Sequence, residues 1–215
     1  MRTAARSIRY MLRRAARQDY PGIVKIQEAN FESARERTSV QGLLNEDFLN
    51  PSLQKYVIAA RPWAENNGSA IYHPGDQVVS YILYEFQAVH FGVHVMSIAT
   101  CPNHQQKGFA RDLMQWCAYH SKERGLDFAD LRVRPSNTPA LNFYESLGYK
   151  EFARDWDYYS TPVEDAVRLK MDLSHTVLEQ PRRIPHQQPQ PAQRTTVQES
   201  YMTNFGIMPN LVPAT

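Results

Sequence analysis

The chain has 215 residues, of which 42% are hydrophobic and 21% are charged, as expected for a globular protein with one domain and some additional segments. Its net charge of +2 is too small to indicate nucleic acid as the main partner, and no apolar run reaches the roughly 20 residues that cross a bilayer. Two cysteines, Cys101 and Cys117, cannot make a disulfide framework or a metal site, so we expect two reduced thiols in a cytoplasmic protein.

The N-terminus is basic. Residues 1–18 contain no acidic residue and six arginines, which are Arg2, Arg6, Arg9, Arg13, Arg14 and Arg17. This composition is typical of a mitochondrial transit peptide. However, Ile8, Tyr10 and Leu12 alternate like the buried side of a β-strand. We therefore predict a flexible segment over residues 1–7 and a strand within residues 7–15, and targeting to an organelle is the alternative.

The first half of the chain predicts two helices and further strands. Asp19 can cap the first helix, and Pro21 suits its first turn. Its apolar stripe consists of Ile23, Val24 and Ile26. The other predicted elements are a short helix at 39–49, a strand at 55–60, a Pro-, Asn- and Gly-rich loop at 61–76, and two strands at 77–86 and 92–100 that turn around Gln87 to Gly92.

The second half alternates helices and strands. A helix follows Gly108 and ends at Gly125, and its predicted apolar face consists of Ala110, Leu113, Met114 and Cys117. The remaining elements are a strand at 128–134, a helix at 138–148 with Pro139 in its first turn, and closing strands at 149–159 and 166–173.

This order of elements predicts a single α/β (α+β) domain over residues 8–173. The domain would contain a mixed, mostly antiparallel sheet of six to seven strands with helices on both faces. Residues 174–215 include a Pro- and Gln-rich stretch without an apolar period, so a disordered tail is predicted.

The segment QQKGFA, residues 105–110, lies where a strand is followed by a helix. The first N–H groups of a helix are unpaired and positively polarised, so they suit a phosphate. Gly108 would let a pyrophosphate approach the backbone, and Lys107 adds a positive charge. The segment is neither a Walker loop nor a Gly-x-Gly-x-x-Gly turn. On its own it could also be a surface turn.

Two separate blocks resemble the GNAT acetyltransferase superfamily. SIATCPNHQQKGFARDLM resembles its Gln/Arg-x-x-Gly-x-Gly/Ala acetyl-CoA signature, and LRVRPSNTPALNFYESLGYKE resembles its second signature. The likeness extends to ribosomal-protein alanine N-acetyltransferases and related protein N-terminal acetyltransferases. The segment DYYSTPVEDAVRLKMDL of this chain resembles the end of their domain. The resemblance covers residues 8–173 and implies an N-acetyltransferase that uses acetyl-CoA as cosubstrate and no metal.

The resemblance also implies roles for individual residues. The backbone of Ile98, Ala99 and Thr100 would pair with the pantetheine arm, and Asn137 would contact the cofactor. Tyr144 would protonate the leaving thiolate, although it could instead be a core aromatic residue. The pyrophosphate loop would consist of Gln105, Gln106, Lys107, Gly108, Phe109, Ala110 and Arg111.

The general base is the uncertain part of this assignment. Arg132 occupies the position where ribosomal-protein relatives carry Glu or His, and a guanidinium cannot accept a proton. His94, on the neighbouring strand, is the substitute, because a neutral imidazole can take a proton directly or through water. The alternative is an ordinary strand histidine. Glu85 is a second candidate, and it could equally be a solvated surface carboxylate.

The resemblance implies that the acceptor is the N-terminal α-amine of a protein or peptide, with a ribosomal protein as one example. Its contacts would come from Phe31, Glu85, Tyr158 and Tyr159, although hairpin packing would also explain the two tyrosines. We expect a monomer or weak homodimer with no nucleic-acid or membrane partner. Two alternatives stay open: an acetyltransferase for a small amine, and a non-catalytic acetyl-CoA-binding regulatory module.

Overall fold

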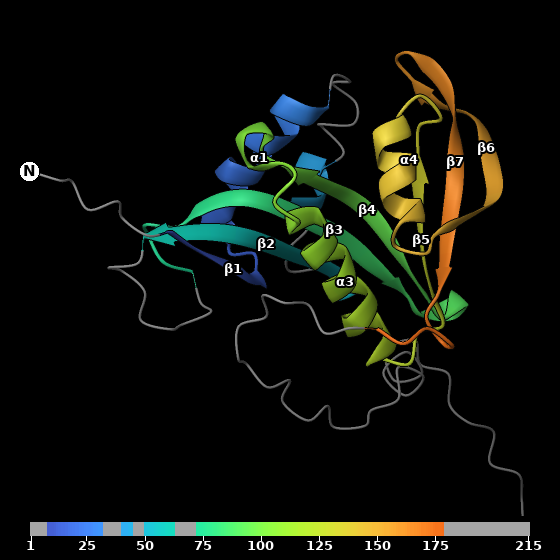
Figure 1. The fold of residues 1–215 in the computed structure, drawn as a ribbon, viewed down its shortest axis with the longest axis horizontal. Helices are drawn as coiled ribbons and strands as arrows, with labels where there is room; N and C mark the ends of the chain where they lie inside the picture. Colours follow the sequence, from blue (N-terminus) through green and yellow to red (C-terminus); the bar gives the residue numbers. More distant parts are fainter. Residues whose placement is uncertain (1–7, 32–39, 45–49, 63–71, 179–215) are drawn as a thin grey trace, which may run out of the picture.

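The structure is a computed structural model that describes residues 8–31, 40–44, 50–62 and 72–178. The chain forms a seven-stranded sheet in the order β1-β2-β3-β4-β5-β7-β6 (Figure 1). The strands are β1 (Ile8–Arg14), β2 (Leu53–Pro62), β3 (Gln77–Gln87), β4 (Gly92–Thr100), β5 (Phe128–Val133), β6 (Lys150–Ser160) and β7 (Val163–Asp172). The helices whose two ends are described are α1 (Tyr20–Asn30), α3 (Phe109–Lys122) and α4 (Thr138–Glu145), with short 3-10 helices η1 (Arg17–Asp19), η3 (Ala88–His90) and η4 (Pro102–His104).

The sheet is mostly antiparallel, as predicted. Among the described strands one contact, between β4 and β5, is parallel. The neighbours β1–β2, β2–β3, β3–β4, β5–β7 and β6–β7 pair antiparallel. The parallel contact arises because α3 carries the chain from the end of β4 back to the start of β5 (Figure 1). The predicted mixed sheet within one α/β domain is therefore confirmed.

Two apolar clusters occupy the two faces of the sheet. Val57 and Ile58 are neighbours on β2 and point to opposite faces, so they belong to different clusters. The larger cluster packs β2–β5 and β7 against α3 and α4, and the smaller one packs β2–β4 against α1 and residues 40–44. We call the two sides the α3 face and the α1 face. Helices on both faces were predicted and are found.

The element boundaries differ from the prediction in a few places. The strand predicted at 166–173 begins earlier, at Val163, and the helix predicted at 138–148 ends at Glu145. Residues 40–44 of the second predicted helix are helical, and the rest of that helix lies largely outside the described residues. The predicted flexible segment 1–7, most of the predicted loop 61–76 and most of the predicted tail also lie outside them.

Asp19 does not cap α1 with its side chain, so that prediction was wrong. Its carboxylate is buried and accepts hydrogen bonds from Arg13 Nη1 at 2.6 Å and from the Ala16 N–H at 2.7 Å. A buried guanidinium is a stronger partner for a carboxylate than the helix N–H groups are. Arg13 also contacts Asp76, which binds Arg61, and this buried ion cluster joins β1, β2 and the turn before β3.

Two further observations concern the described parts of the chain. None of the helices there has the length and apolar character needed to cross a bilayer. Both cysteines are free thiols, and Cys117 is completely buried in the core between α3 and the sheet.

Candidate active site

The strands β4 and β5 begin side by side and then diverge (Figure 1). Their register pairs Gly92 with Phe128 at one end and Val95 with Leu131 at the other. A bulge in β4 follows directly: Leu83 of β3 pairs with Ser97 and Tyr84 pairs with Val95, so Met96 has no partner on β3. Bulges strengthen the local twist and end strand pairing. Residues 98–100 of β4 therefore pair with β3 on one edge, and no described residue of β5 is paired with their other edge.

The start of the parallel contact depends on a glycine. A Cβ placed on Gly92 would lie 2.4 Å from the ring of Phe128, well inside van der Waals contact. Only glycine lets the Phe128 ring lie over the β4 backbone at this point.

The loop between β4 and α3 contains two left-handed residues, Gln106 with φ of 59° and Gly108 with φ of 81°. The Gly108 carbonyl accepts the Asp112 N–H at 3.0 Å, which closes the first turn of α3. No atom lies within 4 Å of a Cβ placed on Gly108, so its Cα faces open space. The loop thus combines an accessible backbone with the N-terminus of a 14-residue helix, which suits an anion.

The predicted pyrophosphate residues lie together in this loop, but their side chains differ in access. Phe109 is 2% exposed and packs its ring 4.7 Å from that of Tyr10, so only its backbone is available. Lys107 and Arg111 are exposed, and Arg111 donates to Ser146 Oγ at 2.8 Å. Gln105 lies near Asn30, with Nε2 3.4 Å from its Oδ1, and Asn30 also donates to the Thr100 carbonyl at 3.2 Å. The end of α1 therefore contacts both the loop and the end of β4.

The predicted cofactor contact Asn137 and the predicted acid Tyr144 lie at the start of α4 and within it. Asn137 caps α4, because its Oδ1 accepts the Ala140 N–H at 3.2 Å. Tyr144 is 8% exposed and belongs to the same cluster as Val95 and Leu131, the last paired residues of β4 and β5. Burial raises the pKa of Tyr144 to about 12, so the hydroxyl is protonated at neutral pH. Among the described residues no hydrogen-bond partner is found for that hydroxyl.

His94, Asp130 and Arg132 lie on the α1 face, because their strand neighbours Val93, Val95, Ala129, Leu131 and Val133 all point into the cluster on the α3 face. Asp130 Oδ1 lies 2.6 Å from His94 Nδ1, and Arg132 Nη1 lies 3.2 Å from His94 Nε2. Both ring nitrogens of the proposed base are therefore occupied in this conformation.

Further charged groups surround this histidine. Arg132 donates from Nε to Asp155 on β6 at 2.6 Å, and Arg168 on β7 lies 3.5 Å from Asp130 and 4.0 Å from Asp155. We call His94, Asp130, Arg132, Asp155 and Arg168 the polar network. Burial raises the pKa of Asp130, but the hydrogen bond with His94 and the nearby arginines outweigh it, so the pKa is below its ordinary value. The network thus contains two negatively charged carboxylates and two positively charged guanidiniums, whose charges cancel.

The two predicted hairpin tyrosines lie next to Arg132 of β5 and Arg134, which follows β5 directly. The guanidinium of Arg132 lies 5.2 Å from the ring centre of Tyr158, and that of Arg134 lies 3.9 Å from Tyr159. The two rings meet edge to face at 5.0 Å. Glu164 accepts from the Ser136 N–H at 2.7 Å and so connects the β6–β7 hairpin to the segment before α4. Tyr158 keeps about half of its surface exposed and is available for contact.

The other two predicted acceptor residues lie on the same side of the sheet. Glu85 pairs with His94 across β3 and β4, and its carboxylate accepts from Asn50 Nδ2 at 2.9 Å and Ser52 Oγ at 3.3 Å. Phe31 ends α1 and packs against the smaller cluster, which includes Ala99. Residues 32–39, which follow Phe31, lie outside the described residues.

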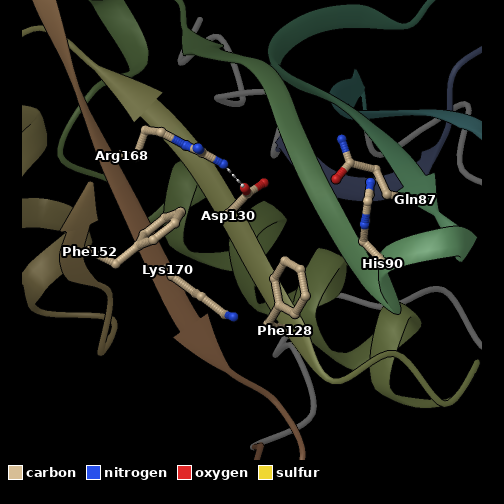
Figure 2. Close-up of a pocket in the computed structure, with 7 residues that line it drawn as sticks. All are labelled: Gln87, His90, Phe128, Asp130, Phe152, Arg168 and Lys170. Atoms are coloured by element: carbon tan, nitrogen blue, oxygen red, sulfur yellow. Dashed lines mark ion pairs between the residues drawn. The ribbon is translucent and has the colours of Figure 1, made fainter. Parts of the chain in front are cut away.

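A cavity of about 340 Å³ opens beside the polar network (Figure 2). Asp130 and Arg168 form an ion pair at its edge, and the Lys170 ammonium lies 3.8 Å from the ring centre of Phe128. The cavity is lined by Gln87, His90, Phe128, Asp130, Phe152, Arg168 and Lys170. It lies at the paired end of β4 and β5, away from the loop of residues 105–111. Among the described residues no group of His, Cys, Asp and Glu is arranged to hold a metal ion.

Asp130, Asp155, Arg168 and Asn30 were not predicted as site residues. For Asp130 a signal existed, since Asp130, Arg132 and Arg134 alternate with apolar residues along one strand, which indicates a polar face. Asp155, Arg168 and Asn30 carried no such local signal, because they reach the site through strand order and helix packing.

The open loop at the N-terminus of α3 follows directly on residues 98–100 of β4, so the structure brings together the residues in which the sequence resembles GNAT acetyltransferases. The family model described as "Acetyltransferase (GNAT) family" matches residues 37–149, just over half of the chain. The chain belongs to this family.

Individual relatives agree with this assignment. The chain is 37% identical over 87 residues to the catalytic subunit of the N-terminal acetyltransferase B complex of Schizosaccharomyces pombe, a match covering 39% of this chain and 48% of the relative. The chain thus spans about half the length of that relative. It is 29% identical over 126 residues to the ribosomal-protein alanine N-acetyltransferase of Escherichia coli, covering 54% of this chain and 84% of the relative.

A solved structure shares the fold. The crystal structure of that Escherichia coli enzyme superposes with a TM-score of 0.59 at 18% identity, covering 79% of this chain and 97% of the other. At this identity the superposition bears on the fold alone.

Proposed function

We propose that this chain transfers the acetyl group of acetyl-CoA to a primary amine, namely the N-terminal α-amine of a protein or peptide. The observation that carries the proposal is the left-handed turn at Gln106 and Gly108, which opens α3 directly after β4 has diverged from β5. The family assignment and the names of the two relatives support the reaction and the class of acceptor.

The residues present fit acetyl-CoA. The first N–H groups of α3 would hold the pyrophosphate, with Lys107 and Arg111 supplying positive charge and Gly108 leaving the approach open. The edge of β4 at residues 98–100, with which no described residue of β5 pairs, would bind the pantetheine arm as an added strand would once Asn30 has released the Thr100 carbonyl. Asn137, at the start of α4, would supply its amide.

Direct transfer requires a neutral amine, donors for the oxyanion and an acid for the leaving thiolate. The amine nitrogen bonds to the acetyl carbon while the carbon–sulfur bond breaks and its electron pair stays on sulfur. The backbone N–H groups near Ala99 would stabilise the oxyanion. Tyr144 would protonate the thiolate, because it is buried at the point of divergence and its raised pKa of about 12 keeps its proton available.

A site whose base is a histidine rather than a carboxylate favours an N-terminal α-amine over a lysine as the acceptor. An α-amine has a pKa of about 7.7–8.0 and a lysine about 10.4, so at pH 7 roughly one α-amine in seven is neutral, against roughly one lysine in a few thousand. His94 or a water molecule can complete deprotonation of the first group more easily than of the second. Arg132 occupies the position where the resemblance implies Glu or His, and its Nη1 lies against His94 Nε2.

The acceptor would bind on the α1 face. Tyr158 and Tyr159 can hydrogen-bond a peptide backbone while their rings cover its first side chain, and Phe31 and Glu85 flank the same side. A ribosomal protein is one acceptor to include in the test, because the name of the Escherichia coli relative specifies one.

One observation favours a second candidate, a non-catalytic acetyl-CoA-binding module. Arg132 occupies the free nitrogen of His94, so no described side chain presents an unoccupied base between β4 and β5 in this conformation. This candidate predicts binding of acetyl-CoA without turnover.

The deciding experiment measures release of the CoA thiol with acetyl-CoA and two peptide pools. One pool has free N-termini and no lysine, and the other has blocked N-termini and internal lysines. Release with the first pool only would support the proposal, and equal release with both would contradict it. A polyamine sample tests the small-amine alternative. Binding of acetyl-CoA by calorimetry, without release on any amine, would favour the non-catalytic module.

A further inference from the structure

The protonation state of His94 follows from its neighbours. A guanidinium carries only hydrogen-bond donors, so the 3.2 Å contact from Arg132 Nη1 requires a lone pair on His94 Nε2. The ring proton of the neutral imidazole is then on Nδ1, which donates to Asp130 Oδ1 at 2.6 Å. The geometry therefore selects one of the two neutral tautomers of His94.

Asp130 is built to keep that tautomer. It is 5% exposed, and its second oxygen faces Arg168 at 3.5 Å (Figure 2). Asp130 is paired with His94 in the parallel register of β4 and β5, at the last but one pair before the strands diverge. The carboxylate is thus fixed from two sides, and its Oδ1 has one hydrogen-bond partner among the described residues, His94.

We propose that Asp130 is a positioning residue for the transfer: it holds His94 with its proton on Nδ1, so that Nε2 can take a proton from the acceptor amine. This inference rests on the proposed function. A buried carboxylate behind an imidazole both orients the ring and stabilises the imidazolium that forms. The bound carboxylate compensates for the absence of a Glu or His at the position of Arg132.

Arg132 donates a hydrogen bond to His94 Nε2, and the acceptor has to replace it there. Nε and Nη1 belong to one planar guanidinium, so Nη1 leaves Nε2 by a rotation of the Arg132 side chain, with Asp155 and Tyr158 as the neighbours that retain it. Nε2 has a single lone pair, so Arg132 has to leave it before the acceptor can donate a proton there. Once Nε2 is protonated this donor cannot return, because an Nε2–H group and an Nη1–H group repel each other.

The proton inventory of the step balances. One proton of the α-ammonium goes to His94 Nε2 and later to solvent. The neutral amine forms the new nitrogen–carbon bond, the carbon–sulfur bond breaks, and the thiolate takes the proton of Tyr144. The second proton lost by the nitrogen returns to Tyr144 through water, so the products are the amide, the CoA thiol and one proton in solution.

The test is a double-mutant cycle on the full chain with a peptide acceptor. Asp130→Asn removes the charge and lets the amide donate to Nδ1, which moves the ring proton to Nε2. We expect a fall in kcat of about 100-fold, in the range of general-base contributions, with the KM for acetyl-CoA unchanged. In a His94→Gln background we expect Asp130→Asn to lower kcat by no more than about twofold, because the residue that Asp130 positions is already absent.

Arg168→Gln is the matched control. It breaks the same ion pair from the other side but leaves the hydrogen bond between Asp130 and His94, so it should lower kcat much less than Asp130→Asn does. Thermal unfolding and calorimetric binding of acetyl-CoA establish that each variant is folded. Nitrogen-15 NMR of the imidazole should show the proton on Nδ1 in the wild type and on Nε2 in Asp130→Asn.

Three outcomes would overturn the inference: an active Asp130→Asn variant, an equal loss from Asp130→Asn with and without His94, or a wild-type ring protonated on Nε2. If the wild-type chain transfers acetyl to no amine, the proposed function fails and this role of Asp130 fails with it. If the wild type is active and Asp130→Asn is unaffected, the role of Asp130 fails alone.

Discussion

Removal of one oxygen atom tests the proposed acid. In Tyr144→Phe the ring of the core cluster stays, and the hydroxyl that would protonate the thiolate is lost. We expect kcat to fall by about 10² to 10⁴, which corresponds to about 2.7–5.4 kcal/mol of transition-state free energy. The free energy of unfolding should change by less than about 0.5 kcal/mol, because the hydroxyl has no hydrogen-bond partner among the described residues. Activity and stability should therefore respond separately.

Tyr149→Phe is the matched control for this substitution. Tyr149 is 3% exposed, its hydroxyl also has no partner among the described residues, and its ring centre lies 5.9 Å from that of Tyr144. It is a similar tyrosine in the same cluster, and we assign it no part in the reaction. We expect its phenylalanine variant to keep the wild-type rate.

The assay is steady-state release of the CoA thiol at saturating acetyl-CoA, together with urea unfolding of each variant. The pKa of Tyr144 is about 12, so its ionisation should not reduce the wild-type rate up to about pH 10. A wild-type rate in Tyr144→Phe would refute the reasoning. Equal losses in the two phenylalanine variants would refute it as well, because they would indicate a packing effect.

Two other predictions concern the loop and the buried ion cluster. Gly108→Trp should abolish calorimetric binding of acetyl-CoA, and the protein should stay folded because the added side chain points into open space. Gly108→Ala should still bind, and the left-handed φ should cost it about 1 kcal/mol of stability. Normal binding by the Trp variant would contradict the loop assignment. Asp76→Asn should destabilise the fold by about 3–5 kcal/mol in urea titration, since Asp76 pairs with the buried Arg13 and Arg61. Burial raises the pKa of Asp76, but the hydrogen bonds from Arg61 and Arg13 outweigh it and the folded pKa is lowered. The stability that Asp76 contributes is therefore complete above about pH 4 and is lost as the pH falls through the lower folded value, so the variant should show a shallower acid slope, and identical slopes would refute this.

The local pattern of the sequence was sufficient for most of the fold. Apolar residues over 77–86 and 92–100 predict two strands, of which the first is buried on both faces of the sheet. The period of Leu113, Met114 and Cys117 predicts the helix that packs on them. The turn at Gly108 was predictable because a left-handed residue before a helix favours glycine. Each of these signals depends on residues that are neighbours in the chain.

The partners of the site residues were decided by tertiary structure alone. His94 and Asp130 are 36 residues apart, and they meet because the chain returns through α3 to pair β5 in parallel with β4. Strand β7 lies between β5 and β6, and this order places Arg168 next to Arg132. Asp19 was predicted as a cap from its position, but burial beside Arg13 gave its carboxylate a charged partner instead. The sequence by itself determined which residues could carry the chemistry, whereas strand order and register determined which of them meet, because hydrogen bonds and ion pairs depend on distance in space.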